Sequence, residues 1–193
     1  MKKVALSEMV RFIPGINSTR VKKQYGVEIE SYYDYESFEK DYKQKDEPET
    51  SYKNDSLISE LSLKEGDVVV NNSLYLATIV GKYNVGKILS LNFTKVEFDE
   101  SKLDKQYFLF LFNSCKDVKN QKDSKLQGSS SVLRIPIREL GDVMVPVVSL
   151  EEQKKIGNIY IESMKLQSKL LKYADLMNQF TTTMIEDTLK GGA

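Results

Sequence analysis

The chain has 193 residues, of which 40% are apolar and 29% are charged, and its 28 basic residues balance its 28 acidic ones. This length supports one globular domain with an appendage and is short for an enzyme with separate cofactor and substrate domains. A neutral total argues against a strongly basic nucleic-acid binder. The charge is nevertheless segregated, because residues 1–26 contain six basic and one acidic residue, whereas residues 27–60 contain four basic and eleven acidic ones.

The cysteine and histidine contents exclude several kinds of site. Cys115 is the single cysteine, so no disulfide within the chain and no cysteine-based zinc cluster can form, and a reducing compartment is expected. The chain contains no histidine, which removes Ser-His and Cys-His nucleophiles and the commonest general base. Ser7, Glu8 and Arg11 interrupt the N-terminal apolar run, and no segment reaches transmembrane length, so a soluble cytoplasmic protein is expected.

The first third of the chain predicts short elements and polar loops. Residues 3–13 alternate loosely between apolar and polar side chains and end at Pro14-Gly15, which predicts a short element followed by a polar loop at residues 17–20. Residues 27–60 are acidic and rich in tyrosine, and their middle, residues 43–55, has the polarity of an exposed loop. Tyrosines of this segment are expected to pack on the domain.

The middle of the chain predicts a sheet. The sequence LKEGDVVV at residues 63–70 is typical of a turn that leads into a buried strand. Residues 75–98 contain β-forming residues interrupted by glycines, which predicts two or three further strands with a hairpin near Tyr83 and Asn84.

A buried helix and two edge segments are expected next. The aromatic and leucine-rich sequence after Asp104 predicts a helix that ends by Asn113, followed by a polar run at residues 116–131. Residues 132–140 and 143–148 each contain one proline, which predicts short strands or extended segments at a sheet edge.

A long helix is predicted at the C-terminus. Ser149 and Glu152 form a capping-box pattern, and no proline follows them. At ~1.5 Å per residue such a helix is ~60 Å long, which is more than the domain needs as a cover. A heptad reading gives an apolar seam that Ser163 alone interrupts, typical of a coiled coil; its apolar members are Ile156, Ile159, Leu166, Leu170, Tyr173, Met177, Phe180 and Met184.

These patterns predict an α+β fold with two regions. Residues 1–149 are expected to form a mixed α/β domain with a twisted sheet, and residues 150–193 a helical spacer that pairs with another helix. A catalytic alternative is a metal-dependent nuclease built on Asp99, Glu100 and Lys102, but such triplets arise by chance in a chain with 29% charged residues. Cys115 has no histidine to activate it, so a structural role is expected.

Polar and basic residues gather in the predicted loops and form a candidate DNA-binding set. Asn, Gln, Arg, Lys and Ser are the side chains that contact base edges and phosphates in protein–DNA complexes, although loops are also polar for general reasons. The set comprises Asn17, Ser18, Thr19, Arg20, Lys22, Lys23, Asn71, Asn72, Lys82, Tyr83, Asn84, Lys87, Lys119, Lys122, Lys125 and Gln127. No catalytic residue and no metal ligand is assigned.

Four motifs occur in an order that resembles the specificity subunit of type I restriction-modification systems. They are VALSEMVRFIPG near the start, LKEGDVVV, LDKQYFLFLF, and LQGSSSVLRIPIRELGDVMVPVVSLEEQKKIGNI. The last motif is the most specific, because this family follows a glycine-serine turn with an isoleucine-rich strand, a "VP" segment and an "EEQ" that opens a helix. The residues that carry this match are Gly128, Ser129, Ile135, Val145, Pro146, Glu151, Glu152, Gln153 and Ile156.

The resemblance implies a non-catalytic subunit that selects the DNA target. The usual family member has two recognition domains and two long helices, whereas this chain has one of each, so a half-length form that pairs as a homodimer is expected, reading a bipartite inverted repeat. The resemblance also implies methyltransferase subunits that carry S-adenosylmethionine and modify adenine, with a restriction subunit as a further partner; this chain would bind no cofactor. The alternative is an orphan or mobile-element copy that docks on a host methyltransferase as a competitor.

Overall fold

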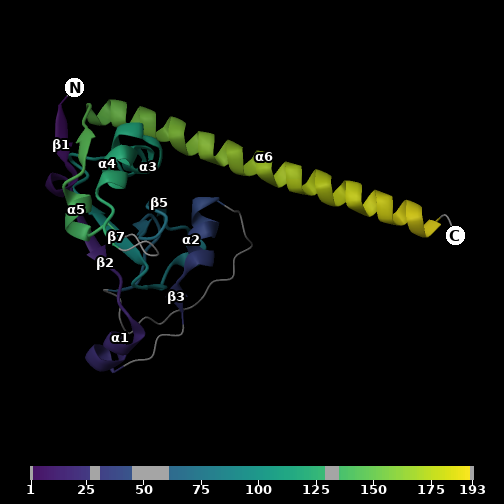
Figure 1. Cartoon of the computed structure of the whole chain (residues 1–193), viewed down its shortest axis with the longest axis horizontal. Coiled ribbons are helices and arrows are strands. Elements are labelled where there is room, and N and C mark those ends of the chain that lie inside the picture. The colour runs from purple at the N-terminus through teal and green to yellow at the C-terminus, as the bar shows by residue number, and fades with distance from the viewer. Residues whose placement is uncertain (1, 27–30, 45–60, 129–134, 192–193) are drawn as a thin grey trace.

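The computed structural model describes residues 2–26, 31–44, 61–128 and 135–191 (Figure 1). The segment predicted as an exposed loop at residues 43–55 lies mostly outside the described residues. The elements in chain order are β1 (Lys3–Ala5), η1 (Leu6–Glu8), β2 (Val10–Pro14), α1 (Ser18–Tyr25), β3 (Tyr32–Tyr33), α2 (Tyr35–Tyr42), β4 (Val68–Asn71), β5 (Leu76–Ile79), η2 (Lys82–Asn84), β6 (Ile88–Leu89), β7 (Phe93–Phe98), α3 (Lys105–Ser114), α4 (Lys116–Ser124), α5 (Ile137–Gly141), β8 (Met144–Pro146) and α6 (Leu150–Gly191).

The central sheet has four antiparallel strands in the order β2-β7-β4-β5. The predicted strand at Val68–Asn71 is β4, and its β-branched residues suit an inner strand that is buried on both faces. Two smaller sheets pair β1 with β8 in antiparallel fashion and β3 with β6 in parallel. Mixed helices and strands, together with a long C-terminal helix, confirm the predicted α+β fold class.

Each face of the central sheet has its own apolar cluster. Val68, Val70 and Val96 belong to the larger cluster, which includes the aromatic residues of α3. Val69 and Phe93 belong to the smaller one, in which Phe93 packs edge-on against Tyr33 at a centroid distance of 5.2 Å. Tyr33 is fully buried, so one of the tyrosines predicted to pack on the domain does so.

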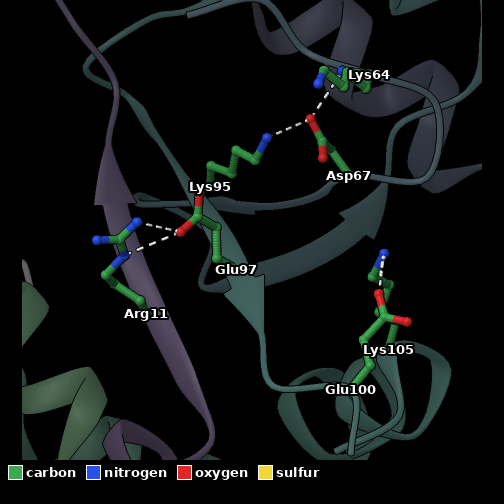
Figure 2. A network of polar contacts seen from close by, with 7 residues as sticks. All are labelled: Arg11, Lys64, Asp67, Lys95, Glu97, Glu100 and Lys105. Carbon is green, nitrogen blue, oxygen red and sulfur yellow. Dashed lines mark hydrogen bonds and ion pairs between the residues drawn. The ribbon is translucent and has the colours of Figure 1, made fainter. Parts of the chain in front are cut away.

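Charged side chains lie beside the smaller cluster on β2 and β7. Arg11 donates from Nε to Glu97 Oε2 at 3.0 Å, and Lys95 Nζ lies 2.7 Å from Asp67 Oδ2 (Figure 2). The same Asp67 oxygen accepts the backbone N–H of Lys64 at 2.8 Å, which closes the turn before β4. The cations of Arg11 and Lys95 therefore face carboxylates of the same chain, which leaves this part of the surface close to neutral.

The long helix α6 contacts the domain along its first part, as far as Ser168, whose hydroxyl donates to the carbonyl of Lys43. Gln153, Gly157 and Ile161 are buried against the domain. A Cβ atom on Gly157 would lie 2.7 Å from Gln106 Cβ and from Tyr107 N, so α6 and α3 approach too closely there for any side chain. All side chains described from residue 169 to residue 191 are exposed, and this part of the helix projects away from the domain (Figure 1).

Both predicted helices with clear signals begin where expected. The capping box forms, because Glu152 N donates to Ser149 Oγ at 3.3 Å and Ser149 N donates to Glu152 Oε2 at 3.2 Å. Asp104 caps α3 by accepting the backbone N–H groups of Gln106 and Tyr107. Side-chain acceptors placed directly before apolar runs were therefore reliable signals.

Several predicted loops and strands are wrong. Residues 17–20 begin a helix in place of a loop, because Asn17 accepts the backbone N–H of Arg20 at 2.7 Å and caps α1. Residues 116–124, from the polar run, form α4, whose buried side chains are Val118 and Lys122. Residues 137–141 form helix α5 in place of an edge strand, although β8 does lie at the edge of its two-stranded sheet.

The predicted hairpin near Tyr83 and Asn84 is also wrong. These residues lie in η2, where Asn84 Nδ2 donates to the carbonyl of Ser37 at 3.2 Å and is buried. The hairpin is instead the β4–β5 turn at residues 72–75, which Tyr75 closes with a φ of 51°. The number of strands between residues 75 and 98 agrees with the prediction, since β5, β6 and β7 lie there.

Candidate nucleic-acid interface

The two ends of the central sheet lead into different parts of the chain. At one end, which we name the loop end, Pro14 pairs with Thr94 and Asn71 with Phe93, and the chain continues into α1, the 72–75 turn and the 90–93 turn. At the other, the junction end, Val10 pairs with Phe98 and the chain leads into α3. Figure 1 shows α1 and α6 on opposite sides of the domain.

Helix α1 presents the basic part of the candidate set at the loop end. Ser18, Thr19, Arg20, Lys22 and Lys23 are all exposed on this helix, and Val21 is its buried anchor. Gly26 ends the helix in the left-handed conformation at a φ of 70°. The helix contains no acidic residue, and within the described residues no ion pair neutralises Arg20 or Lys23. Its field is therefore positive, and anions are attracted to it.

The position of α1 relative to the sheet is fixed by the segment that precedes it. Gly15 N donates to the carbonyl of Phe93 at 3.0 Å, and Ile16 N donates to that of Leu89 at 2.9 Å. A Cβ atom on Gly15 would lie 2.0 Å from the carbonyl oxygen of Ser90, so only glycine permits this approach. The glycine of the first motif thus holds α1 against the 90–93 turn.

Two predicted DNA-binding residues, Asn71 at the end of β4 and Asn72 in the 72–75 turn, serve the fold. Asn71 is fully buried, and its Oδ1 accepts the N–H groups of Ser73 and Leu74, so its prediction as a DNA contact is wrong. Asn72 is half-buried and bridges to the neighbouring turn, where its Nδ2 donates to the carbonyl of Leu91 at 3.1 Å. At the tip of the turn, Ser73 and Leu74 are exposed.

The segment 81–87 is held against α2 by a polar network. Asp41 accepts the hydroxyl of Tyr33 at 2.8 Å and the backbone N–H of Gly81 at 3.0 Å, and burial raises the pKa of this carboxyl group. Burial and the nearby Asp41 also raise the pKa of Tyr33. Asn84 is buried in this network, and Lys87 Nζ donates to Ser37 Oγ at 2.7 Å. Asn84 is therefore a structural residue, whereas Lys82 is exposed.

Helix α4 separates into buried and exposed candidates. Lys122 is 5% exposed, donates to the carbonyls of Tyr75 and Phe112, and lies 4.0 Å from the Phe112 ring centroid, so its prediction as a DNA contact is wrong. Burial lowers the pKa of Lys122 to about 8. Lys125 pairs with Glu139 at 2.8 Å. Lys119, on α4, and Gln127, shortly after it, are exposed but are not part of α1. The structure therefore does not bring the whole candidate set together.

Residues of two sequence motifs, LDKQYFLFLF and the last one, meet at the junction end. The carbonyl of the Gln153 side chain accepts the backbone N–H of Asp104 at 2.9 Å, and its amide donates to the carbonyls of Lys102 and Val148. The hydroxyl of Tyr107 donates to the carbonyl of Pro146 at 3.1 Å. These contacts join α3, β8 and α6, so the motifs fix the direction in which α6 leaves the domain.

The predicted seam of α6 lies away from the domain. At about 100° per residue, the seam residues centre on the side of the helix roughly opposite to Gln153, Gly157 and Ile161. Seven of them, Ile159, Leu166, Leu170, Tyr173, Met177, Phe180 and Met184, are between 55% and 71% exposed. Ile156 differs, because it is half-buried and packs against the larger apolar cluster. A partner helix can therefore lie along this side without meeting the domain.

The residues of the nuclease alternative form ion pairs at the surface. Lys102 lies 2.8 Å from Asp99, and Lys105 lies 2.9 Å from Glu100 (Figure 2). Hydrogen bonds from Lys102 and Ser101 hold the pKa of Asp99 at about 2. Across the described ranges, no group of three or more Cys, Asp or Glu side chains is arranged to hold a metal ion. No helix in these same ranges combines the length and apolarity needed to span a bilayer.

The loop end also exposes residues that sequence reasoning missed. Leu74 and Leu91, at the tips of the two turns, are 56% and 55% exposed, and Tyr35 beside them is 47% exposed. The hydroxyl of Tyr35 donates to Ser73 Oγ at 2.9 Å. The signal for this surface in the sequence was weak: the segments NNSLY and SLNFT, which form the two turns, contain no charged residue.

An α+β domain with a projecting helix is thus the class that the fold defines, and comparisons with known proteins add little to it. No protein-family model matches the chain, and no curated protein sequence matches it. Among solved structures, the crystal structure of the HsdS subunit from Thermoanaerobacter tengcongensis aligns with a TM-score of 0.45 and 18% sequence identity. The alignment covers 64% of this chain and 32% of that chain, so this chain matches about a third of its length.

Proposed function

We propose that this chain is the DNA sequence-recognition subunit of a type I restriction-modification complex, acting without catalytic residues of its own. The observation that carries the proposal is the separation of two exposed surfaces. A basic helix with polar turns lies at the loop end, and an apolar seam on a projecting helix begins at the junction end. The resemblance of the sequence motifs to the specificity subunit agrees with this division.

In this proposal the loop end contacts double-stranded DNA. Arg20 and Lys23 supply positive charge for phosphates, and Ser18 and Thr19 can bond to either phosphates or base edges. An α-helix of ordinary diameter fits the major groove, where each base pair presents a distinct pattern of donors and acceptors. Basic residues elsewhere, such as Arg11 and Lys95, are already paired with carboxylates and add little.

The seam of α6 would pair two copies of the chain as an antiparallel homodimer. Because the seam faces away from the domain, each domain lies on the outer side of its own helix, at opposite ends of the helix pair. Two identical domains related by a two-fold axis read an inverted repeat, and the helix pair sets the distance between its halves.

Catalysis would belong to partner subunits. Methyltransferase subunits that bind S-adenosylmethionine would dock on the helix pair and methylate adenine, and a restriction subunit would join the assembly. The projecting helix has apolar residues outside the seam, including Leu171, Ile185 and Leu189, which are 56%, 56% and 75% exposed. These side chains leave apolar surface for helices of such partners after two copies have paired.

Co-expression with a type I methyltransferase subunit in cells without adenine methylation tests this function. Methylated adenines are then mapped across the genome, with the methyltransferase subunit alone as the control. A bipartite symmetric motif that depends on this chain supports the proposal. Stable binding to the methyltransferase without any methylation would instead indicate a competing docking module, and metal-dependent cleavage by the chain alone would indicate a nuclease.

A further inference from the structure

Two exposed leucines mark the tips of adjacent turns at the loop end. Leu74 belongs to the 72–75 turn and Leu91 to the 90–93 turn, and both side chains are more than half exposed. The turns touch through Asn72, whose N–H donates to the carbonyl of Asn92 at 2.9 Å and whose side chain donates to that of Leu91. The two leucines therefore stand on one connected surface.

This surface is held rigidly from below. Asn71 Oδ1 accepts two N–H groups of the 72–75 turn, at 2.9 Å and 3.0 Å. Asn72 Oδ1 accepts the hydroxyl of Thr94 at 2.9 Å, and the Tyr35 ring lies 5.6 Å from that of Phe93. Because these contacts fix the backbone of both turns, the leucines are presented in a defined place before any partner binds.

The surroundings of the leucines favour DNA as the occupant. The turns carry no charge, and the 90–93 turn contacts the segment before α1 through the N–H of Gly15. The 90–93 turn therefore lies near the start of a helix whose charged residues are all basic, and the 72–75 turn is joined to it through Asn72. In the major groove, the one apolar group on a base edge is the C5-methyl group of thymine. If α1 enters the major groove as proposed, a leucine near the start of α1 can pack against that methyl group.

We propose that Leu74 and Leu91 determine part of the target sequence by packing against thymine methyl groups. This inference rests on the proposed function and adds to it the chemical feature of the bases that these side chains detect. Burying one methyl group changes binding by about fourfold, so each contact discriminates modestly and both together give a clear preference.

Replacement of thymine by deoxyuridine tests the inference, because it removes only the methyl group. The complex of the full chain with its methyltransferase subunit is titrated with duplexes of the mapped target in which single thymines are replaced. The wild-type complex should lose about fourfold in affinity at the contacted positions. In Leu74→Ala or Leu91→Ala the loss should disappear at the position that the missing side chain contacted.

Leu150→Ala is the matched control, since Leu150 is an exposed leucine at the start of α6, and it should keep the wild-type sensitivity. A wild-type complex that binds its target specifically but ignores the replacements would overturn the inference, as would leucine variants that retain the sensitivity. Variants that fail to assemble with the methyltransferase would show that the patch binds protein and would also overturn it. If the wild-type complex has no specific target at all, the proposed function itself has failed.

Discussion

Gln153 connects more of the molecule than any other polar side chain at the junction end. Its amide group reaches Asp104, Lys102 and Val148, and the side chain is 1% exposed. Removing the amide therefore takes a hydrogen-bond partner from three backbone groups and leaves a buried space where the side chain lay. The glutamine of the "EEQ" motif is therefore explained by structure alone.

We predict that Gln153→Ala lowers the free energy of unfolding by about 2–4 kcal/mol, because three backbone groups lose their hydrogen-bond partners and a buried side chain is removed. Urea denaturation followed by circular dichroism measures this change. Lys154→Ala, an exposed neighbour on the same helix, is the control and should shift stability by no more than about 0.5 kcal/mol. An unchanged midpoint for Gln153→Ala would contradict the role assigned to this side chain.

Lys122 predicts a pH dependence of stability. Its pKa falls from an ordinary value of 10.5 to about 8 because the side chain is buried. Between these two values the unfolded chain holds a proton that the folded chain has released, so stability rises with pH. The cost of burying the charge is fully present below about pH 8 and amounts to about 3 kcal/mol.

Comparison of wild type with Lys122→Met isolates this effect, since other titrating groups cancel in the difference. We expect the stability of the wild type relative to the variant to increase by about 2–3 kcal/mol between pH 7.5 and pH 10. Thermal or urea unfolding at a series of pH values provides the measurement. A difference that stays constant with pH would mean that Lys122 keeps an ordinary pKa.

The sequence identified residue types at the candidate interface better than residue roles. The exposed group on α1 was found, but Asn71, Asn84 and Lys122 were included although they bond to the backbone inside the domain. Residue type alone does not distinguish an asparagine that closes a turn from one that contacts a base. The two roles differ in which backbone carbonyl and amide groups lie beside the side chain, and tertiary contacts determine which groups these are.

At the scale of elements, α1 predicts the strongest effect on DNA binding. Arg20→Ala with Lys23→Ala should weaken binding of the assembled complex at all sequences and reduce the steepness of its salt dependence by about two phosphate contacts. Fluorescence anisotropy at several salt concentrations tests this. Lys116→Ala, on exposed α4, is the control. Equal losses in both variants would mean that α1 has no special part in binding.

The seam of α6 predicts a change in oligomeric state. Leu170→Glu with Met177→Glu should produce a monomer, because each introduced charge would lose its water in a packed helix pair. Light scattering of the purified chain measures the mass. Lys172→Glu with Gln179→Glu, placed seven residues apart on the opposite, polar side of α6, should leave the dimer intact. A dimer that survives the seam substitutions would refute the assignment.

Elements with strong local signals were predictable, and elements stabilised by distant contacts were not. Helices α3 and α6 begin at side-chain caps before apolar runs, and β4 follows a turn closed by Asp67. In contrast, α4 buries one valine and a lysine stem, which gives no apolar periodicity. The hairpin was misplaced because Asn84 is fixed by Ser37, a residue 47 positions away.

At the scale of the whole molecule, the length of α6 would set the distance between the two domains of the proposed homodimer. Duplicating one heptad of the exposed part, residues 173–179, preserves the seam and lengthens each helix by about 10.5 Å. An antiparallel pair then holds its domains farther apart by that distance. We expect the spacer of the mapped target to grow by about three base pairs. A two-residue insertion is the control, since it rotates the rest of the seam by about 200° to the other side of the helix and should abolish pairing. An unchanged spacer after the heptad duplication would contradict a rigid helix pair.

The projecting part of α6 also has a consequence for the abundance of the chain in a cell. An isolated copy displays a row of large apolar side chains on a helix that receives no support from its own domain beyond residue 168. Such a segment opens readily and is the kind of substrate that proteases and chaperones recognise. Copies left without partners would be removed faster than assembled ones. If the chain acts in a complex as proposed, its abundance would thereby follow that of its partner subunits.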